Sequence, residues 1–256
     1  MIRRVVLAAL ACCAVAVPVA AQDPPKVDFY SASRFFMDAE HLSTDSIHYK
    51  WRADFHGDVD VVTWPHGGKG TFLANYEVVL GNEYRRFDPE QGNYVLEGAA
   101  VQRVKGVEVG AVFHHTSRHI SDRAKRAPVD WNAWGVRVRH EVKRAPLTLA
   151  LQADFRDIVA RSFVDYRNET EGRIDVTYVW RPRIAVVGNA RVRLVGVDDT
   201  YGRDMQTGIR AEGGVRLGGT GGALELYLAG ERRVDADVTV LGPRNWFAAG
   251  FRLRGR

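Results

Sequence analysis

Apolar and polar residues alternate with a period of two along most of the chain from Ile47 onward. In one segment, for example, Leu149 and Leu151 share a face opposite Gln152. Successive side chains of a β-strand point to opposite faces, so each such segment is predicted to be a strand with one apolar and one polar face. Nearly every segment agrees and no helical stripe competes, so the chain is predicted to be all-β.

The polar faces of these segments carry both arginines and acidic residues, as Arg173 and Asp175 do on one segment. An outer-membrane barrel turns such faces inward, where opposite charges on neighbouring strands pair across the lumen. The fold class predicted here is therefore a closed antiparallel transmembrane β-barrel in the bacterial outer membrane. A soluble, exported β-sandwich is the alternative, and it would bury its apolar faces against each other.

Short and long connections also alternate along the chain. Outer-membrane barrels have short periplasmic turns and longer outer loops, so this alternation sets the direction of every strand. It predicts about twelve strands with both ends on the periplasmic side, because barrels of this class have an even strand number. The first strand is placed at 27–36, with a periplasmic extension as the other interpretation of that segment. The short links are 104–107, 143–146, 181–183 and 218–222, and the longer ones are 82–92, 121–130, 160–170, 197–204 and 235–244.

The N-terminus has the pattern of a secretory signal peptide. Arg3 and Arg4 precede a short apolar run, and small residues end at Ala21. The apolar run is shorter than the roughly 20 residues of a membrane-spanning helix, and Pro18 interrupts it. Residues 1–21 are therefore predicted to be a cleaved signal peptide, and residues 22–256 to be the barrel. Both cysteines fall in the signal peptide, which excludes a disulfide framework in the barrel.

The formal net charge of +5 bears on partners rather than on fold. A basic chain in the outer membrane is expected to contact membrane lipids or lipopolysaccharide. Nucleic acid is not expected as a partner, because export removes it and no basic run with interleaved aromatic residues is present.

One predicted strand, 106–119, carries polar residues on its apolar face. Its apolar stripe reaches Phe113 and continues as His115 and Ser117. Counting strands makes this the fifth, running outward, so the two side chains are predicted to face lipid near the outer leaflet. The sixth strand begins near Asn132, which shares its phase with Trp134 and so also faces lipid. The hairpin register is expected to bring Asn132 beside His115.

These three residue types support nucleophilic catalysis. A serine hydroxyl becomes a good nucleophile when a base takes its proton and a third group orients that base. Ser117, His115 and Asn132 would supply these roles. The alternative is a set of polar side chains lying among lipid headgroups, with His114, His115 and His119 as an interfacial cluster. A three-histidine metal site is not expected, because His114 points to the opposite face.

At these residues the chain resembles the outer-membrane phospholipase A family. The matching segments are His115-Thr116-Ser117 and Trp131-Asn132, on the fifth and sixth strands of a twelve-stranded barrel. The resemblance implies that Ser117 is the nucleophile, His115 the base and Asn132 its orienter, in a site facing the membrane. It also implies calcium as a cofactor and a homodimer, although no calcium ligand is carried over. The family continues its serine with Asn-Gly, where this chain has Arg118 and His119.

Two further resemblances concern the same segment. Lipid A deacylases of the outer membrane are similar at the level of the H-x-S motif. The stretch from His115 to Asp122 is similar to an H-x-S-x-H-x-x-D segment of an uncharacterised outer-membrane barrel family. The first functional hypothesis is therefore a lipid acyl hydrolase of the phospholipase A or lipid A deacylase type. The second is a non-catalytic barrel that serves as a narrow channel, a scaffold or an envelope-structure protein.

Overall fold

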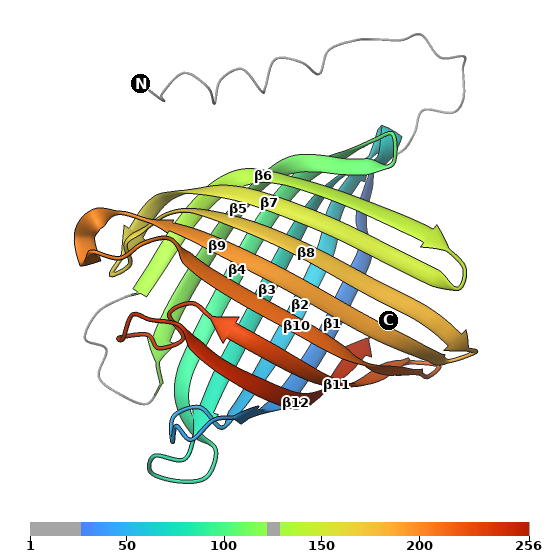
Figure 1. The fold of residues 1–256 in the computed structure, drawn as a ribbon. Coiled ribbons are helices and arrows are strands. Elements are labelled where there is room, and N and C mark those ends of the chain that lie inside the picture. The colour runs from blue at the N-terminus through green and yellow to red at the C-terminus, as the bar shows by residue number, and fades with distance from the viewer. Residues whose placement is uncertain (1–26, 122–128, 256) are drawn as a thin grey trace, which may run out of the picture.

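The computed structural model describes residues 27–121 and 129–255, and these residues form a closed antiparallel barrel of twelve strands (Figure 1). Each strand pairs with its sequence neighbours, and the first strand pairs with the last to close the barrel. The strands are β1 (Asp28–Ser43), β2 (Trp51–Trp64), β3 (Gly68–Gly81), β4 (Asp88–Val104), β5 (Val107–Ile120), β6 (Val129–Arg144), β7 (Leu147–Ser162), β8 (Tyr166–Arg181), β9 (Ile184–Val197), β10 (Gln206–Gly218), β11 (Gly222–Arg233) and β12 (Arg244–Gly255).

The barrel confirms the predicted fold class and strand number. A strand does lie at 27–36, and it extends to Ser43, so this segment is not a periplasmic extension. The prediction of a long link at 160–170 is wrong, because β7 continues to Ser162 and β8 begins at Tyr166. The soluble sandwich is also excluded, because β1 pairs with β12 and the twelve described strands form one closed sheet rather than two packed sheets. The predicted signal peptide, residues 1–21, lies outside the described residues.

The two faces of each strand differ as the alternation predicts. On β6, Trp134, Val136 and Val138 point outward and are exposed, whereas Arg137 and Arg139 line the interior. The same outward exposure of large apolar side chains recurs around the barrel, as at Leu228 and Phe247 on its other side. A closed barrel with an apolar exterior belongs in a membrane, where every backbone group is paired within the sheet. No helix among the described residues is long and apolar enough to cross a membrane.

Charged side chains pair across the interior. The Arg210 guanidinium donates to Glu40 Oε2 over 2.7 Å and to Glu231 Oε2 over 3.0 Å. The Arg52 guanidinium also lies 2.8 Å from Glu231 Oε2. Arg52, Arg210 and Glu231 of this network line a cavity of about 810 Å³, together with many other charged side chains. The predicted pairing of arginines with acidic residues inside the barrel is therefore present.

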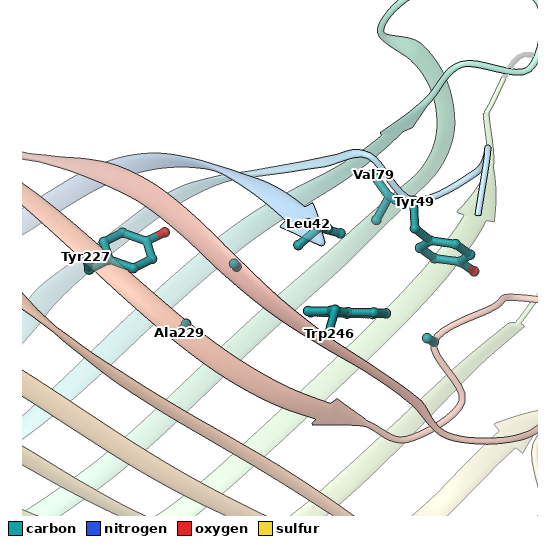
Figure 2. Packing of buried hydrophobic residues seen from close by; sticks show 8 residues of the cluster. Leu42, Tyr49, Val79, Tyr227, Ala229 and Trp246 are labelled. Carbon is teal, nitrogen blue, oxygen red and sulfur yellow. The ribbon is translucent and has the colours of Figure 1, made fainter. Parts of the chain in front are cut away.

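Apolar residues pack inside the barrel at the end with the longer connections. Trp246 on β12 lies with Leu42, Val79 and Tyr49 in one buried cluster, which Figure 2 shows from close by. A second buried cluster surrounds Trp131. The connection between β11 and β12, residues 234–243, contributes Ala236 to the first cluster and Val234 and Val238 to the second. This connection folds into the barrel mouth rather than away from it.

Candidate functional site

The candidate site lies on the outward face of β5. Alternation along this strand sends His115, Ser117 and His119 outward and His114, Thr116 and Arg118 inward. Polar contacts confirm the inward set, because His114 Nδ1 lies 3.1 Å from Glu97 Oε2 in the lumen. Arg118 donates to the backbone oxygen of Asp235 over 2.6 Å, within the connection that enters the barrel. His114 is thus separated from the other two histidines by the sheet itself.

The neighbouring strands place specific partners beside each outward side chain. On β6, Asn132 pairs in register with His115, and Asp130 pairs with Ser117. On β4, Leu96 pairs with His115, Tyr94 with Ser117 and Gly92 with His119. Directly paired side chains on one face lie about 4.5–5.5 Å apart at their Cβ atoms, so each pair is in reach of contact. The register therefore assembles polar groups from two strands around Ser117.

His115 and Asn132 are hydrogen-bonded, with 2.8 Å between His115 Nδ1 and Asn132 Oδ1. An amide oxygen only accepts, so the imidazole Nδ1 donates and the Nε2 of the neutral ring carries a lone pair. This is the tautomer that a general base requires. The predicted proximity of Asn132 to His115 is therefore present in the hairpin.

Ser117 uses a different partner from the one that the sequence motif suggests. Its Oγ lies 2.7 Å from Nε2 of His119, two residues further along the same face. No hydrogen bond joins Ser117 to His115 among the described contacts. The catalytic roles of Ser117, His115 and Asn132 remain predictions, and the structure adds His119 to the residues that bear on them. The i, i+2 spacing from Ser117 to His119 was the sequence signal for this contact.

An aromatic row packs beside His119. The rings of Tyr94 and His119 meet edge to face, with centroids 5.6 Å apart. Tyr76 on β3 stacks on Tyr94 at 4.7 Å, and Phe55 on β2 follows at 6.4 Å. Aromatic pairs of this geometry each contribute about 0.5–1.5 kcal/mol beyond their buried area. The imidazole of His119 is thereby supported by three strands besides its own.

Among the described residues, the register partners of His115 and Ser117 do not by themselves form a calcium site. Calcium takes six to eight oxygen ligands. Among the four register partners of His115 and Ser117, Asp130 is the one carboxylate, and the amide oxygen of Asn132 is already bonded to His115. A separate group of possible ligands, His48, Glu83 and Glu90, lies in and beside the connections at the outer rim. There His48 Nδ1 is 3.1 Å from Glu90 Oε2 and 3.6 Å from Glu83 Oε2.

Comparison with known proteins supports the fold. No protein-family model matches the chain, and no curated protein matches it in sequence. An outer membrane phospholipase (OMPLA) from Salmonella typhi, solved as a dimer with bound calcium, is similar with a TM-score of 0.53 at 10% identity, covering 87% of this chain and 90% of that one. Outer membrane phospholipase A from Escherichia coli gives a TM-score of 0.52 at 11% identity, covering 89% of this chain and 98% of that one.

A third solved structure is Omp33 from Acinetobacter baumannii, with a TM-score of 0.43 at 12% identity, covering 88% of this chain and 97% of that one. The architecture is that of bacterial outer-membrane β-barrels, the class in which the two phospholipases fall. The apolar exterior and the closed sheet give the physical reason for an outer-membrane location.

Proposed function

We propose that this outer-membrane barrel is a serine-dependent lipid acyl hydrolase with Ser117 as its nucleophile. The observation that carries the proposal is the 2.7 Å contact between Ser117 Oγ and an imidazole on the membrane-facing side of the barrel. A serine and a base within about 2.6–3.2 Å of each other form the basic unit of nucleophilic catalysis. A pair of this kind facing lipid has lipid esters as its nearest substrates.

The surroundings of Ser117 suit an ester at the membrane interface. Toward the membrane centre, the face continues as Phe113 and Trp134, whose rings lie 5.0 Å apart and present an apolar surface for acyl chains. At the level of Ser117 the face carries Asp130, whose carboxylate can accept from headgroup donors, and Asn132, whose amide NH2 can donate to headgroup or ester oxygens. The ester carbonyl of a membrane lipid lies at the boundary between these two zones. The substrate class is therefore phospholipid or the ester-linked chains of lipid A.

Two imidazoles lie next to Ser117 along the strand. The resemblance to the phospholipase A family assigns the base to His115, which Asn132 orients by the 2.8 Å hydrogen bond. The serine hydroxyl would then rotate about its Cα–Cβ bond, away from His119. In either arrangement the chemistry is the same, because Ser117 Oγ attacks the carbonyl carbon and an imidazole takes the proton.

The experiment is ester release by the refolded barrel. Phospholipid vesicles and lipopolysaccharide are each supplied to the wild type and to Ser117→Ala, and released fatty acid is measured. We expect release by the wild type and loss of at least a thousandfold in the variant, with both proteins shifting on heating in a gel as folded barrels do. Asn245→Ala serves as the control, because Asn245 is exposed on β12, which four strands separate from β5 around the barrel. Equal release by Ser117→Ala and the wild type would remove the proposal.

The resemblance also implies calcium and a homodimer, and both are testable on this barrel. The Salmonella typhi phospholipase is a dimer with bound calcium. Because the described register partners of Ser117 include one carboxylate, Asp130, and no set of six oxygen ligands, we expect ester release to persist after chelation with EGTA. Mass measured by light scattering in detergent, with and without calcium, reports whether two copies associate.

The non-catalytic hypothesis is best tested through the lumen. Two apolar clusters pack inside the barrel, and Arg210 and Arg52 pair with carboxylates in its interior. These contacts disfavour a conducting channel. We expect no stable conductance steps in planar bilayers. If the barrel also releases no fatty acid from lipid esters, a scaffold role is the hypothesis that is left.

A further inference from the structure

We infer that His119, rather than His115, is the general base that takes the proton of Ser117. This inference rests on the proposed function and specifies its proton transfer. Ser117 has one hydroxyl proton to give, and its oxygen lies 2.7 Å from Nε2 of His119. A general base must lie within hydrogen-bond reach of the proton it removes, and His119 meets that condition without any movement.

The position of His119 is set by its surroundings rather than by Ser117 alone. Its ring meets Tyr94 edge to face, and Tyr94 is stacked on Tyr76. The register partner of His119 on β4 is Gly92, and a Cβ there would come within 3.0 Å of the Tyr76 hydroxyl. The glycine thus leaves room for Tyr76 to reach over β4 toward the site. A ring held in this way keeps its Nε2 directed at Ser117.

One ring nitrogen of His115 already has a hydrogen-bond partner on β6. Its Nδ1 donates to Asn132, which fixes the plane of the ring toward β6. Using it as the base would require the Ser117 hydroxyl to give up a 2.7 Å bond and turn along the strand. The His115–Asn132 pair instead acts as a positioning unit on the β6 side, where it can hold the ester or headgroup beside Ser117. The Asn-Gly of the phospholipase A family has no imidazole at the position of His119, so this assignment belongs to the present chain.

His119 also lies on the side of Ser117 nearer the end of β5, closer to the aqueous boundary. The proton that leaves Ser117 returns to it by the end of the reaction. Ser117 Oγ bonds to the ester carbonyl carbon as its proton passes to His119 Nε2. The imidazolium then protonates the departing lipid oxygen as the carbon–oxygen ester bond breaks. Water next gives its proton to His119 and attacks the acyl-serine, and Ser117 recovers the proton as the fatty acid leaves.

The test compares conservative variants of both histidines in the refolded full barrel, with phosphatidylethanolamine vesicles as substrate. His119→Gln keeps the volume and hydrogen-bonding capacity of the side chain but cannot carry the transferred proton. We expect it to fold as the wild type does and to lower kcat by roughly 10²–10⁴-fold with little change in KM. His115→Gln is the matched control, and we expect it to lower kcat less than tenfold and to change mainly KM.

The pH profile separates a base from a structural contact. Wild-type kcat should rise with pH through about 6–7, as one imidazole loses its proton. His115→Gln should keep this increase of kcat with pH, and His119→Gln should lose it. Imidazole added to the assay should restore part of the activity of His119→Ala. A full rise and near-normal kcat in His119→Gln would overturn the inference, as would equal losses in both histidine variants. If Ser117→Ala keeps full activity, the proposed function itself is wrong. If activity is lost in His115→Gln but not in His119→Gln, the proposed function stands and the assignment of His119 as the base is wrong.

Discussion

Arg203 forms hydrogen bonds that join three outer connections, and we predict how much its removal lowers the free energy of unfolding. It lies between β9 and β10 and donates to Asp165, in the connection between β7 and β8, with 2.7 Å from Nε to Oδ2. It also donates to Asp235, in the connection between β11 and β12, over 2.8 and 2.9 Å. Each of these carboxylates is 1% exposed. Arg203→Met would keep the apolar stem and remove the charge.

The expected cost follows from the partners that would remain. Asp235 would still accept from the Tyr166 hydroxyl and from the Gly242 N–H, each over 2.7 Å. Asp165 would lose the guanidinium that both of its carboxylate oxygens contact. Removing one partner of a buried ion pair costs about 3–5 kcal/mol. We expect the lower value, about 3 kcal/mol, because only one of the two carboxylates is stripped. This is a change of roughly a hundredfold in the unfolding equilibrium.

Urea unfolding of the refolded barrel, followed by tryptophan fluorescence, measures this free energy. Arg173→Met is the matched control, because the Arg173–Asp175 pair is 45% and 39% exposed and such a pair contributes about 0–1 kcal/mol. Asp165→Asn in the Arg203→Met background should recover a large part of the loss, since it removes the unpaired charge. If Arg203→Met and Arg173→Met unfold at the same urea concentration, the argument that Arg203 compensates buried carboxylates is wrong.

Three further predictions concern the same barrel. Replacing 236–241 with a short Gly-Ser linker should open the mouth and give measurable conductance in planar bilayers, because this connection contributes to both apolar clusters. A bilayer without conductance would show that the lumen is closed elsewhere. Leu151→Arg on the lipid-facing side should destabilise the barrel by about 2–4 kcal/mol in urea unfolding from bilayers, whereas Thr177→Arg in the lumen should cost far less. Burial acts to raise the pKa of Asp235, but hydrogen bonds from Arg203, Tyr166 and Gly242 outweigh it and hold the pKa below its usual range. This carboxylate should therefore stabilise the mouth above about pH 4, its unfolded pKa, and lose that effect as the pH falls through the lower folded pKa. Protease cleavage within 234–243 should accordingly increase only in acid. Cleavage that does not depend on pH would contradict the assignment.

The barrel itself could be predicted because its physical basis is local. Alternation with a period of two assigns a face to each side chain, and a membrane requires every backbone group to be paired. Long and short connections then set the direction and number of the strands. The same logic placed His115, Ser117 and Asn132 on one face, where the register indeed pairs Asn132 with His115.

The inward path of residues 234–243 and the partner of Ser117 depended on the tertiary structure. Val234 and Val238 pack against Trp131, more than a hundred residues earlier in the chain, and no periodicity encodes such a contact. Ser117 has an imidazole two residues away on either side, at equal sequence spacing, so alternation alone could not choose between them. The choice comes from neighbouring strands: Asn132 on β6 engages His115, and Tyr94 on β4 packs against His119. Alternation decides which face a side chain occupies, whereas the register of adjacent strands decides what it touches there.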